Sequence, residues 1–277
     1  MAKSTAVAKV EEENTALVMP DWMKEDAGLG MEGVDDSRSS LPRISIVHPL
    51  SKAVEEGKAK AGHFFHSQLE EDLGDSLTII PVFFESGWTL WEPNGNSAPL
   101  ARGRRNEKGV WVWDPSNTKF EVINKEGKKE IWDTKGSIAE SKLAHWPKGS
   151  PPPAAKESLN VLMVLPEIGP EAVGVFSFSK SAFPIGSKFK QSIALRVGRS
   201  PVWGVKFKLE TTSTTNNKNQ KFIVPKLTFA GFNDSKDVYD ACKMLHSRVK
   251  DTGLYGSMAE ESDHGGGDGT VIDSKDF

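Results

Sequence analysis

The sequence predicts a mainly β protein with one or two helices. Its apolar segments are short, and several alternate apolar with polar residues as half-buried strands do. Long polar loops separate these segments, and few stretches space their apolar residues as a helix does. Many strands with few helices favour an antiparallel barrel or sandwich over a parallel sheet with crossover helices.

The first strands follow a polar, acidic segment, residues 1–40, that we expect to be mostly disordered. Residues 41–47 alternate as a strand does. Residues 77–84 form a continuous apolar run whose β-branched and aromatic content indicates a buried strand, and residues 87–91 continue the β pattern. Pro81 lacks a backbone N–H, so we expect an edge or a bulge at that point.

Further strands and two helices are expected in the rest of the ordered part. The strands are expected over residues 110–113, 119–123, 128–132, 159–165, 172–178, 202–209 and 220–232. Residues 124–127 read as a hairpin turn. One helix is expected after Pro184, and a clearer one over residues 235–250, with Asn233 and Asp234 as N-cap candidates. An OB-like antiparallel barrel with insertions is the arrangement that we expect.

Charge is distributed unevenly along the 277 residues, whose formal net charge is −3. Residues 1–43 hold nine acids and five bases, and residues 256–277 hold six acids and one base. Residues 44–255 between them hold 29 bases and 23 acids. A mildly basic body can attract phosphate, and acidic ends can shield it from other polyanions.

Several classes of protein are disfavoured. The single cysteine, Cys242, rules out an internal disulfide and a zinc site made of cysteines alone, and it fits a reducing cytoplasm. No apolar run approaches the roughly 18 residues that a membrane span needs, and the first residues lack the apolar core of a signal peptide. No nucleotide-binding or hydrolase motif is present, so we expect neither an enzyme nor a cofactor.

One weak metal pattern occurs near residue 63. His63, His66 and Glu70 would approach one metal ion if this stretch were helical. No HExxH motif and no cysteine accompany them, and ordinary partly buried histidines explain the pattern as well. We therefore assign no metal site.

Aromatic and basic residues gather in the middle of the chain, where seven tryptophans lie between residues 88 and 203. Single-stranded DNA binding uses this mixture, because each base stacked on an aromatic ring contributes ~1–3 kcal/mol while lysine and arginine follow the phosphates. The alternative is that most of these tryptophans belong to the core. The candidate DNA-binding residues are Trp88, Trp91, Arg102, Arg104, Arg105, Trp111, Trp113, Trp203, Lys206 and Lys208.

The last segment, residues 256–277, combines glycines with six carboxylates and is expected to be a disordered tether. Its final residues, Asp276 and Phe277, resemble the acidic tail of bacterial and phage single-stranded DNA-binding proteins. That resemblance implies that Asp273, Asp276 and Phe277 recruit replication, recombination or repair proteins, and that the tail competes with DNA for the basic groove. Lys275 interrupts the acidic run and departs from the pattern. The alternative is a solubilising terminus.

These observations lead to one hypothesis and two alternatives. We expect a phage single-stranded DNA-binding protein that acts in replication or recombination in the host cytoplasm, without a membrane partner and with homo-oligomer formation left open. Its domain covers residues 41–255. The first alternative is a phage structural or assembly protein that does not bind DNA. The second is a metal-dependent nuclease.

Overall fold

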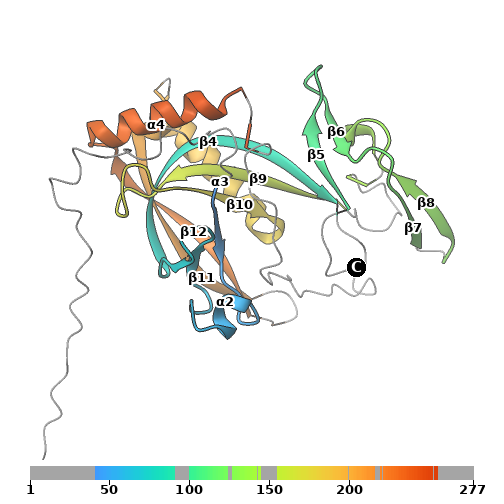
Figure 1. Ribbon diagram of the computed structural model, residues 1–277, viewed down its shortest axis with the longest axis horizontal. Coiled ribbons are helices and arrows are strands. Elements are labelled where there is room, and N and C mark those ends of the chain that lie inside the picture. Colours follow the sequence, from blue (N-terminus) through green and yellow to red (C-terminus); the bar gives the residue numbers. More distant parts are fainter. Residues whose placement is uncertain are drawn as a thin grey trace, which may run out of the picture. The chain divides into compact units, whose positions relative to one another are not determined.

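The computed structural model gives the fold of the central part of the chain (Figure 1). It describes residues 41–90, 100–123, 127–141, 143–144, 155–198, 200–215, 219, 221–251 and 253–254. All of them belong to one compact unit, Ser40–Phe277. The two expected disordered segments, residues 1–40 and 256–277, lie outside the described residues.

Ten of the strands form one mixed sheet. They are β1 (Arg43–Ile46), β2 (Phe64–His66), β3 (Glu71–Asp72), β4 (Ser76–Leu90), β5 (Ala101–Arg105), β6 (Trp111–Asp114), β9 (Ala155–Val164), β10 (Val173–Ser179), β11 (Val205–Thr215) and β12 (Lys221–Phe232). Their order is β12–β11–β4–β9–β10–β1–β2–β3, and β5 and β6 continue from the end of β4. The mainly β class is thereby confirmed.

The expected closed, antiparallel OB-like barrel is not formed by the described strands. β1 and β10 run parallel, so the sheet is mixed. Its path ends at β12 on one side and at β3 on the other, and these two strands do not pair. Helices cover both faces of the open sheet, so its apolar residues are buried without the sheet closing on itself.

β4 is the longest strand and connects the parts of the sheet. Its first residues pair with β11, its middle pairs with β9, and its last two residues pair with β5. The register with β9 shifts between Pro81 and Phe83. This is the bulge that the proline predicts, because the strand continues past a residue that has no N–H to donate.

The helices are α2 (Lys52–Glu55), α3 (Phe183–Val197) and α4 (Lys236–Val249), with short 3-10 turns η2 (Ile138–Glu140), η3 (Lys180–Ala182) and η4 (Val202–Gly204). Both expected long helices are present, and α3 begins at Phe183 with Pro184 in its first turn rather than after it. The N-cap of α4 is Ser235, whose hydroxyl accepts a hydrogen bond from the Val238 N–H at 3.4 Å, rather than Asn233 or Asp234. Trp203 lies in η4 and not in the strand that follows.

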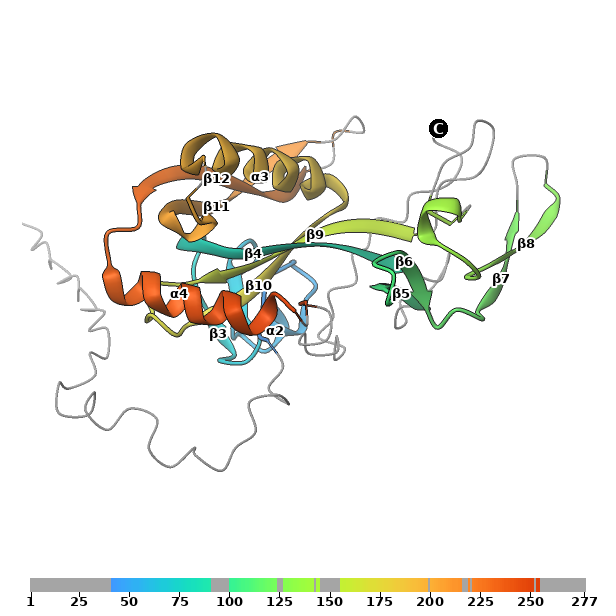
Figure 2. The same ribbon diagram turned by 90° about the horizontal axis from the view of Figure 1, so that it is seen from above.

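Two cores lie on opposite faces of the sheet, one under α3 and one under α4 (Figure 2). On the α3 face, the Phe189 ring lies 4.8 Å from that of Phe207 and 6.1 Å from that of Phe178. On the α4 face, Val238 and Cys242 pack against the sheet. The second half of β9 is buried on both faces, which explains why residues 159–164 are aliphatic apart from Asn160.

A third, smaller core is built from the chain between β4 and β9, which we call the arm (described residues 100–123, 127–141 and 143–144). The arm holds the β5–β6 pair and a separate two-stranded sheet, β7 (Lys119–Ile123) and β8 (Lys129–Asp133), which is the predicted hairpin. Trp113 and Trp132 are buried there together with Leu90, Ile138 and Leu143. These bulky side chains let very short strands enclose a dry interior.

Candidate nucleic-acid interface

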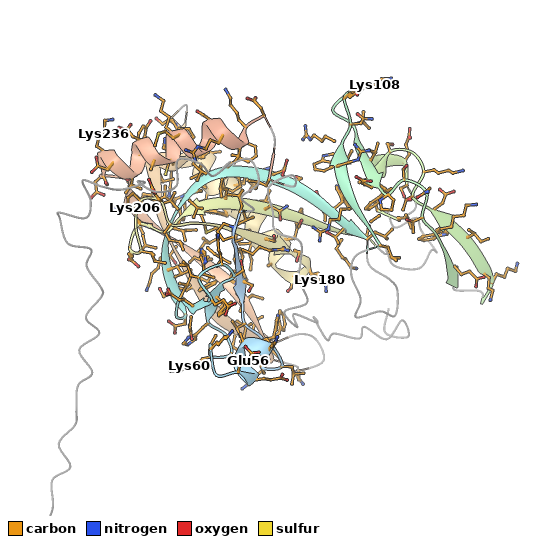
Figure 3. All side chains as sticks on the ribbon, in the orientation of Figure 1. Glu56, Lys60, Lys108, Lys180, Lys206 and Lys236 are labelled. Carbon is orange, nitrogen blue, oxygen red and sulfur yellow. The ribbon has the colours of Figure 1, made fainter. Side chains whose placement is uncertain are left out.

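The basic hairpin, Ala101–Asp114, is the part of the arm that carries most of the candidate residues. It holds four bases and two acids. At its turn the side-chain oxygen of Asn106 accepts hydrogen bonds from the backbone N–H groups of Lys108 and Val110, each at 3.0 Å. Gly109 has φ +73°, a conformation that suits glycine. The turn therefore holds its shape and carries Lys108 at the tip (Figure 3).

The register of the hairpin separates its arginines onto two faces. Arg102 and Arg104 alternate with Gly103 and Arg105 along β5. On one face, the Arg104 Nε lies 3.1 Å from the Asp114 carboxylate, and both side chains are more than half exposed. On the other, Arg105 lies opposite Trp111, with its guanidinium carbon 5.2 Å from the centre of the indole ring. This is a cation–π pair at the edge of the arm's core.

Gly103 fixes the hairpin against the rest of the arm. A Cβ at this position would lie 2.8 Å from the Trp88 Cβ and 2.8 Å from the Ile138 Cδ1. It would also lie 3.4 Å from the Trp111 ring. Trp88 and Trp111 are both half-buried around this contact. The missing side chain therefore lets the Trp88 Cβ, the Ile138 side chain and the Trp111 ring approach the strand closely.

The other tryptophans in the candidate set are placed differently. Trp113 is fully buried in the arm, and Trp203 is 8% exposed. The Trp203 ring packs against His246 at 5.0 Å and Tyr239 at 6.1 Å. A base could stack on Trp113 or Trp203 only if a core opened. Trp91 lies outside the described residues.

Lys206 and Lys208 project from β11 on the face opposite to its apolar residues, as the alternation predicts. Both are ion-paired. The Lys206 Nζ lies 2.6 Å from Asp234, and the Lys208 Nζ lies 2.9 Å from Glu210. The hydrogen bond from Lys206 holds the pKa of Asp234 below its usual value. These carboxylates compete with any phosphate for the two lysines.

The candidate residues do not form one continuous patch. Lys208 lies opposite Thr78 and Arg102 lies opposite Thr89, eleven residues further along β4. At about 3.3 Å per residue, the two positions are roughly 35 Å apart. Figure 3 likewise shows Lys206 far from Lys108 at the hairpin tip. The hairpin and the β11 lysines are therefore two separate basic areas.

One further cation near the hairpin was missed by the sequence analysis. Lys156 of β9 lies opposite Thr89, and Thr89 in turn lies opposite Arg102, so the two cations flank one residue across three strands. Burial, together with the nearby charge of Lys180, lowers the pKa of Lys156. Only the pairing of the strands brings Lys156 next to Arg102, and no local pattern shows that pairing.

Comparison with known proteins identifies the family. Residues 11–254 match the model of a family described as Pam3 phage gp34-like protein. The chain belongs to this family. No curated protein and no solved structure matches it.

Membership makes this chain a phage protein, as the resemblance of its tail implies. The family description names no ligand and no activity, so DNA binding stays a prediction. The tail residues Asp273, Asp276 and Phe277, on which the predicted recruitment of partners depends, lie outside the described residues.

The histidine pattern near residue 63 does not assemble a metal site. His66 uses both ring nitrogens, since Nε2 donates to the Val173 carbonyl at 3.0 Å and Nδ1 accepts from the Leu69 N–H at 3.1 Å. His63 Nδ1 lies 2.8 Å from Asp72 instead, and Glu70 accepts from Lys58 at 2.6 Å. Within the described ranges, no group of three or more His, Cys, Asp or Glu residues is placed to hold a metal ion.

Two other features bear on the reactivity and the membrane association that the chain can have. Cys242 is fully buried under α4, and that burial raises the pKa of its thiol to about 12. Such a thiol is an unreactive core group. In the part of the chain that the structure describes, no helix has the length and apolar character needed to span a membrane.

Proposed function

We propose that this phage protein binds single-stranded DNA, with the basic hairpin as its main contact. The observation that carries the proposal is the pair formed by Arg105 and Trp111, a guanidinium held 5.2 Å over a partly exposed indole ring. An unpaired base can stack on such a surface, whereas a base inside a duplex has no free face.

The cations beside this pair would contact the phosphates of the bound strand. Arg104 and Lys108 are exposed, and Arg102 is half-buried between Thr89 and Asp114. Phosphates that follow a stacked base would meet these side chains, and each contact would release counterions. The Asp114 carboxylate lies 3.1 Å from the Arg104 Nε, so a phosphate would compete with it for this exposed guanidinium.

The lysines of β11 make a smaller contribution in this proposal. Each is paired with a carboxylate that a phosphate would have to displace, and neither belongs to the hairpin that holds Arg105 against Trp111. We also propose, from the resemblance of residues 256–277 to the tails of single-stranded DNA-binding proteins, that the tail recruits replication or recombination proteins.

A salt-dependent binding measurement tests the proposal. Fluorescence anisotropy of labelled oligo-dT is followed across a salt series for the full chain and for a chain ending at Tyr255. We expect log K to fall linearly with log[salt], with a slope near −0.7 for each phosphate that is neutralised. Tighter binding by the shorter chain would show that the tail competes with DNA.

Two triple variants locate the interface. In the first, Arg102, Arg104 and Arg105 are changed to alanine. We expect weaker binding and a salt slope that is smaller in magnitude by about 2. In the second, Lys119, Lys128 and Lys129 are changed to alanine, which removes the same charge from the neighbouring β7–β8 hairpin. We expect this control to have little effect.

Two outcomes would overturn the proposal. One is a wild-type chain, with or without its tail, that binds no oligo-dT at low salt. The other is an equal loss in the two triple variants, which would show a diffuse attraction without a hairpin site. A large, defined and salt-insensitive assembly in light scattering, without DNA binding, would favour the structural alternative. Cleavage of labelled DNA with Mg²⁺ or Mn²⁺ would favour the nuclease alternative.

A further inference from the structure

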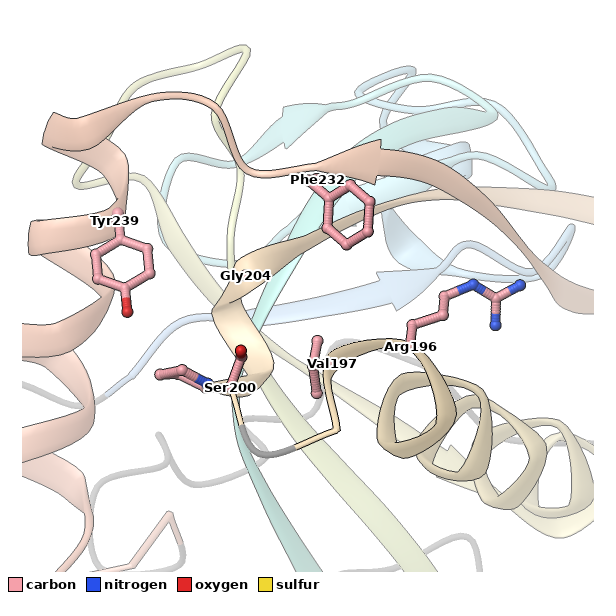
Figure 4. Close-up of a pocket in the computed structure, with 7 residues that line it drawn as sticks. Arg196, Val197, Ser200, Gly204, Phe232 and Tyr239 are labelled. Atoms are coloured by element: carbon pink, nitrogen blue, oxygen red, sulfur yellow. The ribbon is translucent and has the colours of Figure 1, made fainter.

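A small cavity lies where the end of α3, the η4 turn, the end of β12 and the first turn of α4 meet (Figure 4). Its volume is about 230 Å³. Phe232 and Tyr239 line it together with Arg196, Val197, Ser200 and Gly204. None of these residues belongs to the basic hairpin, so the cavity is a second and separate feature of the surface.

Two aromatic side chains from different elements line this cavity, which we call the aromatic pocket. Figure 4 shows Tyr239 of α4 and Phe232 at the end of β12 on either side of Gly204. Phe232 is 63% exposed, an unusual position for a phenylalanine in a described part of the chain that otherwise buries most of its aromatic rings. Because this exposed ring stands at the rim of a cavity, it offers an apolar face on which a planar ligand can stack.

The Phe232 and Tyr239 rings both pack against aromatic residues nearer the interior. The Phe232 ring packs edge-on against Phe229 at 5.7 Å, and Phe229 packs against Phe207 of the core at 5.8 Å. Tyr239 packs edge-on against Trp203 at 6.1 Å. Trp203, which the sequence suggested as a stacking residue, therefore supports the ring of Tyr239 from the interior.

Arg196 supplies a positive charge at the pocket. Its guanidinium lies 4.7 Å over the Phe229 ring, and its Nη1 donates to the Ser192 carbonyl at 3.1 Å. Among the described residues, no carboxylate forms an ion pair with it. Unlike Lys206 and Lys208, it would not have to leave an acidic partner in order to contact an anion.

We propose that the aromatic pocket binds one unpaired base of bound single-stranded DNA. The base stacks on Phe232 or Tyr239, and the Arg196 guanidinium contacts an adjacent phosphate. This inference rests on the proposed function. The pocket is smaller than the roughly 300–1,000 Å³ sites that hold drug-sized ligands, so it suits one planar ring system. The guanidinium and the Ser200 and Tyr239 hydroxyls offer hydrogen bonds that a base and its phosphate can use.

Gly204 provides a way to block the pocket without removing a wall. It lines the cavity, and a Cβ built on it would meet no other atom within 4 Å. Gly204→Leu should therefore fill part of the space, whereas Phe232→Ala removes a stacking surface. Leu195→Ala is the matched control, because Leu195 is 86% exposed, precedes Arg196 and does not line the pocket.

The variants are compared on two labelled oligonucleotides, oligo-dT and an abasic oligonucleotide of the same length that keeps every phosphate. We expect Phe232→Ala and Gly204→Leu each to weaken binding of oligo-dT by roughly five- to a hundredfold. Both should leave the affinity for the abasic oligonucleotide and the salt slope unchanged. Leu195→Ala should change neither affinity. Photo-crosslinking of an oligonucleotide with 5-iodouracil should label Phe232 or Tyr239.

The outcomes separate this inference from the proposed function. If wild type binds oligo-dT but neither pocket variant weakens it, the inference is wrong and the proposed function stands. An equal loss on the abasic oligonucleotide would also overturn it, because no base would be involved. If the variants act only in the full chain and not in the chain ending at Tyr255, the pocket holds the tail instead of a base. If wild type binds no oligonucleotide, both proposals fail.

Discussion

The body of the sheet and the arm bury their apolar residues in different ways. In the body, long strands lie between two helices, and β9 contributes side chains to the cores on both faces. In the arm, strands of four or five residues surround Trp113 and Trp132. The comparison teaches that tryptophan plays two roles in one short region. Trp113 and Trp132 are buried and stabilise the arm, whereas the partly exposed Trp88 and Trp111 can still contact a ligand.

The largest effect should come from removing one large aromatic side chain from each region. Phe178 and Trp113 are both fully buried, so Phe178→Ala and Trp113→Ala should each cost about 3–5 kcal/mol. We expect Phe178→Ala to destabilise the whole protein and Trp113→Ala to loosen mainly the arm. Hydrogen exchange resolved by mass spectrometry measures this. Equal loss of protection in β9 and β10 in the Trp113 variant would show that the two regions unfold as one.

A smaller effect is expected from adding a methyl group inside the arm. Gly103→Ala places a Cβ 2.8 Å from Trp88 and Ile138, so we expect a loss of roughly 1–3 kcal/mol and a displaced hairpin. Gly169→Ala in the body is the control, because a Cβ there meets no atom within 4 Å. Thermal unfolding and oligo-dT affinity are the measurements. If Gly103→Ala is as neutral as its control, the close contact at Gly103 does not hold the hairpin.

A pH-dependent effect is expected in the body at Asp72. Partial burial favours the protonated carboxyl, but hydrogen bonds from the Gly74 and Lys60 N–H groups and from His63 outweigh it and hold the pKa of Asp72 below its usual value. This stabilisation is present above the unfolded-state pKa near 4 and is lost as the pH falls through the lower folded-state pKa. Asp72→Asn should therefore cost roughly 1–2 kcal/mol at pH 7, and this difference should shrink as the pH falls below about 4.

Denaturant unfolding at a series of pH values checks this expectation. Asp75→Asn, on an exposed carboxylate nearby, is the matched control and should show no such convergence. A constant difference between wild type and Asp72→Asn across the acid range would contradict the role given to the ionised carboxylate.

The smallest expected effect is on the reaction rate of the Cys242 thiol, which measures how often the body opens. Because burial raises the pKa of its thiol to about 12, we expect almost no reaction with a thiol reagent at pH 8 until the protein unfolds. Phe178→Ala should speed the reaction by destabilising the body, and Trp113→Ala should not. Equal acceleration by the two variants would contradict independent opening of the arm.

Much of the body was predictable from sequence because local patterns determine it. Alternation and apolar runs located β4, β9, β10, β11 and β12, and a proline located the bulge. The open mixed sheet was not predictable, because the parallel pairing of β1 with β10 joins residues more than a hundred positions apart. Short-range periodicity carries no information about such a partner.

The candidate site was less predictable, for a related reason. Alternation shows which residues of β6 share a face, but it does not show that this face covers Trp113 while leaving part of Trp111 exposed. Likewise, Lys156 and Arg102 lie on either side of Thr89 only because β9 and β5 both pair with β4. Phe232 and Tyr239 stand in segments whose patterns predict a strand and a helix, and only tertiary packing brings them to one pocket.

One pairing in the sheet also bears on how the protein can change over evolution. β4 ends at Leu90 and β9 begins at Ala155, and these two residues lie directly opposite each other at the end of the β4–β9 ladder. A two-residue turn could join them, because that is the usual connection between adjacent antiparallel strands. The arm is therefore inserted at the end of the β4–β9 ladder, so its length can change without altering the register of the strand pairs in the body.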